Sequence, residues 1–235
     1  MTISHETHRP NSCSIIIPAY NEERRIKDVI LRYLDEFPGQ EFIIVCDGKD
    51  NTSNIIKYLS SYYSNLRLLS FDERLGKGRA IIEGFKVANG ELIGFVDADE
   101  SVNPNDIKRM FNAIKDFDGI IASRRLKESK ILVKQPLKRR IASKTFNLIV
   151  RSLFGLPFKD TQCGAKFFRR NAILDIIDDL ETSGFEIDVE ILWRLKNEGY
   201  NVLEYPITWK HSEGSVLKLS NSWDMLVSLL KIRFK

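Results

Sequence analysis

Two aspartates that stand one residue apart, Asp97 and Asp99, directly follow the apolar run 92–96. Such a short apolar run predicts a buried strand, and two carboxylates at its end are costly unless a cation neutralises them. In an open α/β sheet, ligands bind at the carboxyl ends of the strands. Carboxylate oxygens at that place suit Mg²⁺ or Mn²⁺ carrying a phosphate group. Because a solvated turn can also hold two aspartates, the interpretation depends on the rest of the chain.

The elements that would position these carboxylates alternate along the first half of the chain. Five apolar runs predict strands, at residues 14–17, 42–46, 66–69, 92–96 and 119–123. Helices are expected between them, at residues 22–36 (with Asn21 as N-cap), 51–63, 76–88 and 103–117. This alternation predicts an α/β fold with a mostly parallel sheet flanked by helices. Asp47 follows the second strand and Arg124 and Arg125 follow the fifth, so charges would gather at one edge of the sheet, as a nucleotide site requires.

The segment Gly76-Lys77-Gly78 opens one of these helices and raises the question of a phosphate-binding loop. A Walker loop has the pattern Gly-x-x-x-x-Gly-Lys-Ser/Thr, but here Phe71 stands at the first glycine position and Gly78 follows the lysine. The Walker interpretation therefore fails. Two glycines and a lysine at a helix start still suit close approach to a diphosphate, and a plain flexible turn explains them equally well.

Length and composition are those of one globular domain of 235 residues with enough apolar residues for a full core. No apolar run approaches the roughly 18–20 residues of a membrane span, and no signal-peptide pattern opens the chain. The three cysteines, Cys13, Cys46 and Cys163, lack metal-ligand spacing and predict reduced thiols of a cytosolic protein. These features argue against a transmembrane protein and against a disulfide-stabilised secreted one.

Positive charge is concentrated in one block of the sequence. Residues 121–170 contain fourteen Lys and Arg but two Asp and Glu, a balance of +12, so with a net charge of +4 the rest of the chain carries −8. Such a block points to an anionic partner, which is a phosphate, a nucleic acid backbone or an acidic membrane surface. No aromatic stacking platform or recognition-helix motif accompanies the block, and this disfavours nucleic acid.

The basic block is expected to form a loop and a helix. The loop spans residues 126–136, and the helix over 139–154 carries a polar stripe on one face, formed by Arg140, Lys144, Asn147 and Arg151. Further on, a helix is expected over 185–199 and an edge strand over 202–209. The last helix begins near Ser222, with one apolar face formed by Trp223, Leu226, Val227, Leu230 and Phe234. The basic stripe and this amphipathic end are compatible with an acidic membrane surface.

Several of these motifs together resemble a known family. The segments Ile15–Glu23, Asp47-Gly48, Gly76–Gly78 and Asp97–Asp99 resemble, in order and spacing, the inverting glycosyltransferases of family 2, which have the GT-A fold. In the second half, the resemblance narrows to the dolichyl-phosphate β-glucosyltransferases and their relatives, the dolichyl-phosphate mannose synthases. The segments that carry it are Asp160–Gly164, Phe185–Glu190 and Trp209–Ser215.

The resemblance implies a role for individual residues. Contacts with the base and ribose of a nucleotide sugar are implied for Pro18, Tyr20, Glu22, Val45 and Asp47, with Lys77 near that half of the site. Asp97 and Ala98 would contact the nucleotide, and Asp99 would ligate a Mg²⁺ or Mn²⁺ ion on the diphosphate. The acceptor phosphate would be held by Arg124, Arg139 and Ser143, with Arg140 in the same cationic cluster.

Three positions depart from the family pattern. Cys46 replaces an aspartate that usually precedes Asp47, and Ser101 stands where the mannose synthases often have glutamine, so a second metal ligand at Ser101 is less certain than Asp99. Val216 replaces a lysine, which leaves Lys210 or Lys218 to supply positive charge on the donor side.

The expected activity follows from the charge of the acceptor. A lipid phosphate is already an anion and needs positioning by cations more than it needs a base, whereas a hydroxyl acceptor would require a base, for which Asp188 is the candidate. The expectation is transfer of a hexose to a polyprenyl or dolichyl phosphate, from UDP-glucose or alternatively from GDP-mannose. The enzyme would lie peripherally on the cytoplasmic face of a membrane. Residues 1–12 would form a tail, 13–125 the nucleotide half, 126–220 the acceptor half and 221–235 an amphipathic helix.

Overall fold

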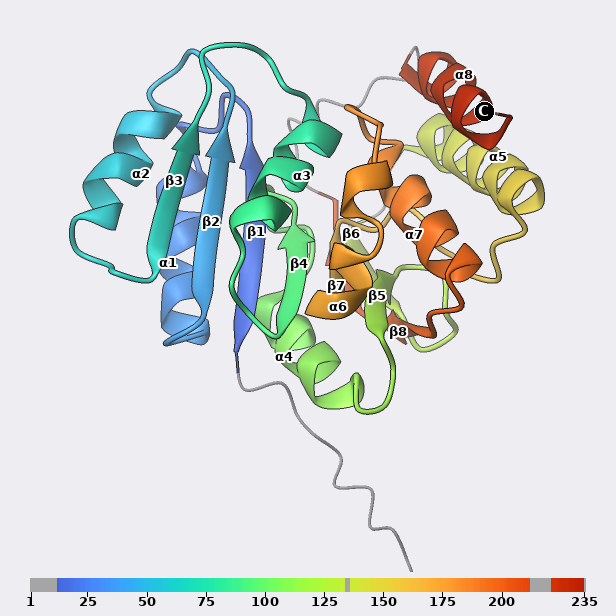
Figure 1. The fold of residues 1–235 in the computed structure, drawn as a ribbon, viewed down its shortest axis with the longest axis horizontal. Coiled ribbons are helices and arrows are strands. Elements are labelled where there is room, and N and C mark those ends of the chain that lie inside the picture. Colours follow the sequence, from blue (N-terminus) through green and yellow to red (C-terminus); the bar gives the residue numbers. More distant parts are fainter. Residues whose placement is uncertain (1–11, 134–135, 212–220, 235) are drawn as a thin grey trace, which may run out of the picture.

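The computed structural model describes residues 12–133, 136–211 and 221–234. A seven-stranded sheet lies at its centre (Figure 1). Its strands are β1 (Cys13–Ala19), β2 (Glu41–Cys46), β3 (Leu66–Ser70), β4 (Leu92–Val96), β5 (Gly119–Ser123), β7 (Ala165–Arg169) and β8 (Val202–Pro206). The spatial order is β3-β2-β1-β4-β7-β5-β8.

Most neighbouring strands in this sheet are parallel. The pairs β1–β2, β1–β4, β2–β3 and β5–β8 are parallel, and β7 runs antiparallel to both of its neighbours. The predicted mostly parallel sheet is therefore confirmed. Because β1, β2, β3 and β4 run in the same direction, their carboxyl ends lie along one edge, at the top of the view in Figure 1.

Helices cover both faces of the sheet. They are α1 (Ile26–Glu36), α2 (Thr52–Ser60), α3 (Lys77–Val87), α4 (Pro104–Ala113), α5 (Leu137–Phe154), α6 (Arg170–Leu174), α7 (Ile187–Asn197) and α8 (Asn221–Arg233), with a short 3₁₀ turn η1 (Ile177–Asp179). As predicted, α4 begins at the N-cap Asn103, whose side chain accepts the N–H of Asn105, followed by Pro104. The long helix α5 ends at Gly155, whose φ of 61° is the left-handed conformation that glycine adopts without steric cost.

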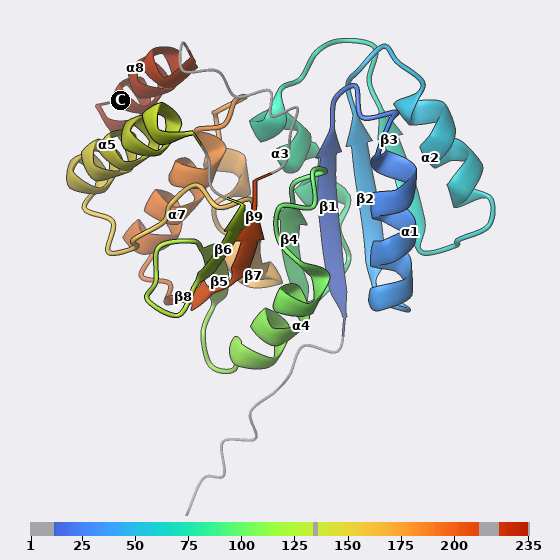
Figure 2. The ribbon, with the colours of Figure 1, turned by 180° about the vertical axis from the view of Figure 1, so that it is seen from behind.

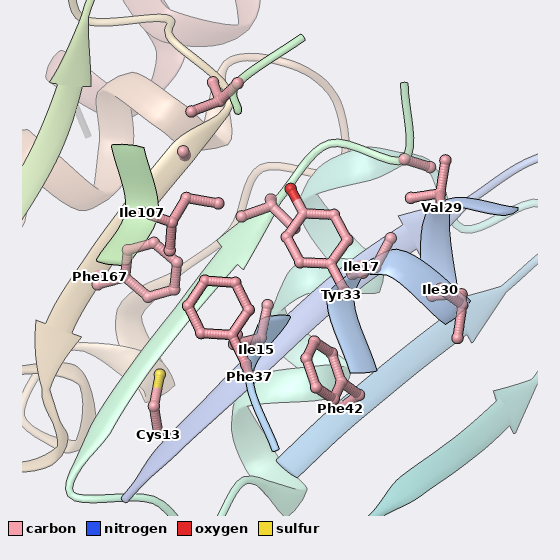
Figure 3. Close-up of a cluster of buried hydrophobic side chains, with 14 of the residues drawn as sticks. Cys13, Ile15, Ile17, Val29, Ile30, Tyr33, Phe37, Phe42, Ile107 and Phe167 are labelled. Carbon is pink, nitrogen blue, oxygen red and sulfur yellow. The ribbon is translucent and has the colours of Figure 1, made fainter. Parts of the chain in front are cut away.

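Alternation along the strands produces two apolar layers. Ile15 and Ile17 of β1 pack in the layer under α1, α2 and α4, whereas Ile16 packs in the layer under α3, α6 and α7. Figure 3 shows the first layer, where Tyr33 of α1 and Phe37, which directly follows this helix, lie over β1 and β2. The second layer extends outward through α5 and α8, so both of these helices are part of the same core.

The segment Leu126–Pro136 was expected to be a loop, and the structure corrects this. It contains the strand β6 (Lys130–Val133), which pairs in parallel with β9 (Thr208–Lys210) in a separate two-stranded sheet. The edge strand expected over 202–209 is correspondingly split, because β8 pairs with β5 whereas β9 turns away to join β6. The buried carboxylate of Asp106 fixes the turn by accepting the N–H of Thr208 at 2.9 Å.

Asn21 does not cap the first helix, which begins only at Ile26 with Arg25 at the N-cap position. Asn21 has a φ of 56° and its Oδ1 accepts the N–H of Lys49 at 3.1 Å. A second bond, from the N–H of Glu22 to Oγ1 of Thr52, measures 2.9 Å. The predicted N-cap at Asn21 is wrong because Asn21 and Glu22 form these hydrogen bonds with residues that follow β2.

The faces expected for two helices are also corrected. On α5, Asn147 is buried, with its amide donating to the carbonyl of Lys159 and accepting from Thr161, so the stripe from Arg140 to Arg151 is not continuous. On α8, the buried residues are Met225, Leu229 and Ile232, whereas Val227, Leu230 and Phe234 are exposed. The reason is that α8 packs beside α5 and uses a different face from the one with the most apolar residues.

In the described part of the chain, no helix is both long and apolar enough to cross a membrane. The three cysteines are unpaired and buried, which agrees with the expected free thiols. Burial raises the pKa of Cys46 to about 11 and that of Cys163 to about 12, so both thiols stay protonated at neutral pH.

Candidate active site

A cleft beside the ends of β1 and β2, here called the strand-end cleft, has a volume of about 120 Å³. Its lining includes most of the residues for which nucleotide contacts were expected, namely Pro18, Tyr20, Glu22, Asp47, Lys77, Asp97, Ala98 and Asp99. The exception is Val45, whose side chain is fully buried in the layer under α3. Two further cationic residues line the cleft, Arg25 and Arg74, which the sequence analysis had not singled out.

A second space, here called the central cavity, has a volume of about 150 Å³. It is lined by the expected acceptor and metal residues Ser101, Arg124, Arg139, Ser143 and Asp188. Further lining residues were not expected, and they include Gln162, Phe185, Trp209, His211 and Met225. Arg140 lies instead in a groove next to this cavity.

The cleft and the cavity meet at one place. Lys77, Asp97, Asp99 and Phe185 line both of them, and we call this shared wall the junction. A ligand held in the cleft and a second ligand held in the cavity would therefore approach each other beside two carboxylates and an ammonium group. The carboxyl ends of β4 and the start of α3 supply these side chains, as expected for an open α/β sheet.

The four charged side chains behind the junction form a chain of alternating sign. Nζ of Lys77 lies 2.9 Å from Oδ1 of Asp97 and 2.9 Å from Oδ2 of Asp188. The other oxygen of Asp188 accepts from Nζ of Lys166, which also donates to the carbonyl of Cys163 at 2.7 Å. Lys166 is fully buried on β7, so the chain runs from the interior of the sheet to the junction.

These contacts determine the charge of each group. Burial alone would raise the pKa of Asp188, but Lys166 and Lys77 outweigh it and lower the pKa. Burial opposes the charge of Lys77, yet Asp188 and Asp97 raise the pKa of Lys77 above its usual value. Desolvation raises the pKa of Asp97, and although Lys77 lowers it, Asp99 and Asp188 add to the rise. The junction thus holds crowded carboxylates that a further cation would stabilise.

The donor atoms at the junction fit a hard divalent cation. Asp97 and Asp99 present carboxylate oxygens, and Ser101 adds a hydroxyl in the same cavity. The backbone N–H of Ser101 donates to Oδ1 of Asp99 at 2.9 Å. Within residues 12–133, 136–211 and 221–234, no group of three or more His, Cys, Asp or Glu side chains is arranged to hold a metal. The oxygens of Asp97, Asp99 and Ser101 suit Mg²⁺ or Mn²⁺, which would take its remaining ligands from phosphate and water.

Asp47 organises the rim of the strand-end cleft. Its Oδ2 accepts the N–H groups of Leu75 and Gly76, each at 2.9 Å, and also pairs with the guanidinium of Arg74. That guanidinium lies 3.6 Å from the centroid of the Tyr20 ring. A buried carboxylate therefore fixes the loop before α3 and places Arg74 over the cleft.

The structure explains Gly76 and Gly78 by close packing of protein backbone. A Cβ on Gly78 would lie 2.3 Å from the carbonyl oxygen of Thr182, and one on Gly76 would lie 2.4 Å from that of Ser183. The N–H of Gly78 donates to the same Ser183 oxygen at 2.8 Å. Buried Glu190 holds this facing segment by accepting the N–H of Thr182 at 2.9 Å. The two glycines therefore bring residues 182–184, and with them Phe185, against the start of α3.

Gly164 has a direct role in placing Asp97, and its replacement gives a first prediction. A Cβ on Gly164 would lie 1.8 Å from Oδ2 of Asp97, while the N–H of Asp97 donates to the Gly164 carbonyl at 2.9 Å. We expect Gly164→Ala to displace the Asp97 carboxylate and to lower kcat/KM about 100-fold, as for other small misplacements at a reacting centre. Steady-state kinetics with a thermal unfolding curve will measure it. Gly39→Ala is the control for a loss of folding stability alone, because Gly39 has a φ of 83° with no atom near its Cβ position: it should lower the unfolding temperature and leave kcat/KM unchanged. Equal kinetics of Gly164→Ala and the unmodified protein would contradict the role of Gly164.

Arg124 is held by a partner that the sequence analysis had not identified. Its Nε and Nη2 donate to the two oxygens of Asp160 at 2.7 and 2.8 Å, and its N–H donates to Asp160 at 3.0 Å. Although burial opposes ionisation of Asp160, Arg124 lowers the pKa of this carboxyl far below its usual range. Asp160 is buried and Arg124 is partly exposed, so Arg124 presents a rigid guanidinium to the cavity with its charge largely balanced.

Other cationic residues around the cavity have different surroundings. Nη2 of Arg125 donates to both the carbonyl and the hydroxyl of Ser143 at 3.1 Å, which fixes Ser143 on α5. Arg139 lines the cavity from the first turn of the same helix. Lys210, one of two lysines expected to act on the donor side, lies 3.9 Å from Glu100 and away from both spaces. The other, Lys218, lies outside the described residues, as do Glu213, Ser215 and Val216.

Comparison with known proteins identifies the class to which this fold and this site belong. Residues 14–177 match the model of Glycosyl transferase family 2, and the chain belongs to that family. Within it, the chain is similar to dolichyl-phosphate beta-glucosyltransferases. It is 32% identical to one from Trichomonas vaginalis, over 93% of this chain and 72% of the relative. It is 31% identical to one from Saccharomyces cerevisiae, over 97% of this chain and 76% of that relative.

Solved structures with the same architecture include enzymes with nucleotide and metal bound. Glucosyl-3-phosphoglycerate synthase from Mycobacterium tuberculosis, in complex with Mn²⁺, UDP and phosphoglyceric acid, superposes with a TM-score of 0.68 at 15% identity, over 95% of this chain and 78% of that one. A mannosyltransferase from Pyrobaculum calidifontis, in complex with GDP-Man and Mn²⁺, gives 0.60 at 16% identity, over 97% and 64%. These likenesses confirm the GT-A fold.

Proposed function

We propose that this enzyme transfers a hexose, with inversion, from a nucleoside diphosphate sugar to the phosphate of a polyprenyl lipid such as dolichyl phosphate. The observation that carries the proposal is the junction, where Lys77, Asp97 and Asp99 border both the strand-end cleft and the central cavity. A donor in the cleft and an acceptor in the cavity would meet there. The acceptor is supported by the names of the relatives from Trichomonas vaginalis and Saccharomyces cerevisiae. UDP-glucose is the donor we favour, with GDP-mannose as the alternative.

The residues of the cleft would bind and orient the donor. Tyr20, Glu22 and Asp47 line the part of the cleft next to β1 and β2, where the base and ribose would lie. A Mg²⁺ or Mn²⁺ ion held by Asp99, with Asp97 and Ser101 beside it, supplies positive charge to the departing diphosphate when it is bound. Lys77 adds a fixed ammonium at the same place, and its raised pKa keeps it protonated at neutral pH.

The residues of the central cavity would hold the acceptor. Arg124 and Arg139 line it from two different elements, and Ser143 contributes a hydroxyl fixed by Arg125. A phosphate monoester is an anion near neutral pH, so the oxygen that attacks the anomeric carbon does not have to lose a proton to a base. Positioning against the donor is then the main contribution of the cavity.

The surroundings of Asp188 favour a phosphate acceptor over a hydroxyl acceptor. Both of its oxygens accept from ammonium groups, those of Lys77 and Lys166, and its pKa is lowered. A general base works best when its pKa lies near the operating pH and its oxygen can reach the proton it removes. The pKa of Asp188 is shifted away from neutral pH and both of its oxygens are already engaged, so we assign it to holding Lys77 rather than to activating a hydroxyl group.

The proposed function predicts a lipid-linked product. We expect the purified protein with Mn²⁺, labelled UDP-glucose and a polyprenyl phosphate to form an organic-extractable labelled lipid, and to form less of it from GDP-mannose. A chelator should abolish the reaction. The matching measurement is the thermal shift of the protein with each nucleotide sugar, with and without Mn²⁺. If no donor yields labelled lipid while one does label a soluble glycan, the hydroxyl-acceptor alternative is correct.

The same proposal includes the organisation and place of the enzyme. Residues 13–125 would form the nucleotide half and 126–220 the acceptor half of one domain, since β7 and β8 of the second half pair within the same sheet as β4 and β5. The enzyme would act at the surface of the membrane that holds its acceptor, on the cytoplasmic face, where nucleotide sugars are at hand.

A further inference from the structure

A groove lies next to the central cavity, between β6 and α5. Its volume is about 150 Å³, and three of its lining residues, Arg124, Ser143 and Trp209, also line the central cavity. On its outer side the groove is lined by Ile131 of β6 and by the stems of Arg140 and Lys144 of α5. The inner end therefore adjoins the expected place of the acceptor phosphate, and the outer end is at the protein surface.

The surface around the outer end of the groove carries exposed aliphatic side chains. On β6, Ile131 is 36% exposed and Val133 is 49% exposed, and on α5 the values are 67% for Leu137 and 57% for Ile141. We call these four residues the β6–α5 face. Leu137 and Ile141 are one helical turn apart, and the stripe continues through Lys144 to the exposed Leu148. Aliphatic side chains exposed together in this way mark an interaction surface.

The charges around this face are almost all positive. Among the described residues from 126 to 148, the exposed charged side chains are those of Lys127, Lys130, Arg140 and Lys144 against one acidic residue, Glu128. An apolar strip with a basic border is the pattern of a surface that lies at the interface of an anionic bilayer. A protein partner would need acidic groups to match this border, and its binding would not explain why the groove connects to the central cavity.

We propose that the groove receives the isoprenoid chain of the lipid phosphate and that the β6–α5 face rests on the anionic bilayer from which this lipid comes. The inference rests on the proposed function for the identity of the lipid, and it adds the location of its hydrocarbon chain. The phosphate lies in the central cavity, and the remaining chain stays in the membrane. The first isoprene units pass between α5 and the wall formed by the paired residues Ile131 and Trp209. The basic border binds the lipid headgroups, so the mouth of the groove faces the bilayer.

The test uses the full chain with two paired substitutions. In Leu137→Asp/Ile141→Asp the β6–α5 face receives two negative charges. In the control Tyr58→Asp/Tyr62→Asp the same charges are placed on exposed Tyr58 of α2 and on exposed Tyr62 in the turn that follows it. Figures 1 and 2 both show α2 and α5 at opposite ends of the sheet. All four positions are exposed, and Leu137 is the first residue of α5, where an acidic side chain favours the helix.

Two measurements are made on each protein. The first is co-sedimentation with phosphatidylcholine vesicles that contain or lack phosphatidylserine, and we expect the α5 variant to bind the anionic vesicles at least about tenfold more weakly than the unmodified protein and the control. The second compares a long polyprenyl phosphate in these vesicles with water-soluble dimethylallyl phosphate. For the α5 variant, KM for the long acceptor should rise about tenfold while kcat/KM for the short one changes less than about twofold.

The outcomes separate this inference from the proposed function. Equal vesicle binding by all three proteins, or an equal loss with both acceptors, would overturn the inference. A concentration-dependent dimer that only the α5 substitutions dissociate, seen by analytical ultracentrifugation, would assign the face to a second copy of the chain and overturn it as well. If no phosphate is an acceptor, the proposed function fails, and vesicle binding still tests the β6–α5 face by itself.

Discussion

Replacement of Asp99 by Asn is expected to reduce kcat/KM for hexose transfer at least about 1,000-fold, equivalent to about 4 kcal/mol of transition-state stabilisation. Asp99 lines both the strand-end cleft and the central cavity, and an amide in its place removes a negative charge from the proposed site of the divalent cation. The N–H of Ser101 still has an oxygen acceptor in the variant, so the loop keeps its bond and folding should be little changed.

A second measurement distinguishes metal binding from a structural effect. The thermal shift that Mn²⁺ adds in the presence of UDP should disappear in Asp99→Asn, while the unfolding temperature without ligands stays close to that of the unmodified protein. Asp116→Asn is the matched control, because Asp116 is exposed and lies before the amino end of β5, at the opposite edge of the sheet. A variant that keeps its Mn²⁺-dependent shift and its activity would show that Asp99 is not a metal ligand.

Replacement of the buried Lys166 by Met is expected to lower kcat about 100-fold with little change in the affinity for the nucleotide sugar. Lys166 touches neither cavity, and it acts through Asp188, which in turn holds Lys77 at the junction. Without Lys166, one oxygen of Asp188 loses its partner and Lys77 is no longer fixed between two carboxylates. Lys166 is thus a positioning residue.

The pH dependence of kcat/KM in Lys166→Met distinguishes a positioning role from a merely structural one. The lowered pKa of Asp188 means that its charge and the contacts it makes are present above the usual value of about 3.9 and are lost only as the pH falls through the lower, folded-state value. When Lys166 is removed, burial is no longer outweighed and the pKa rises. The acid limb of kcat/KM should therefore begin at a higher pH than in the unmodified protein.

Folding of this variant needs its own control, because breaking a buried ion pair costs about 3–5 kcal/mol. Lys166→Arg keeps the charge and should restore most of kcat. Lys166→Met/Asp188→Asn removes both charges from the interior and should recover stability without recovering kcat, since Lys77 still lacks its anionic anchor. If the double variant recovered both, or if Lys166→Met showed the pH profile of the unmodified protein, the positioning role would be wrong.

Much of the fold could be predicted because its signals are local. The runs around Ile16, Ile44 and Phe95 are apolar and β-branched or aromatic, and each is followed by a helix. The start of the helix after Phe95 is recognisable at Asn103-Pro104. The errors arose where a distant segment competes with a local pattern. Asn21 bonds to the loop after β2 instead of capping a helix, and β9 leaves the path of β8 to pair with β6.

The candidate site divides in the same way. Asp97, Asp99 and Asp47 could be placed together in advance, since each follows a strand of a parallel sheet and such strands end at one edge. No pattern in the sequence pairs Lys166 with Asp188 or Arg124 with Asp160, which are 22 and 36 residues apart. The full burial of Lys166 can be known only from the tertiary structure, because burial depends on neighbours from other elements.

The sequence by itself determined which chemical groups stand at the strand ends, because the order of apolar runs and charged residues is written along the chain. The tertiary structure decided what each charge does. A contact across 111 residues, between Lys77 and Asp188, makes the carboxylate of Asp188 a partner of a lysine at the junction. The physical reason is that the charge and orientation of a buried group follow from the partners around it, and folding brings these together from distant parts of the chain.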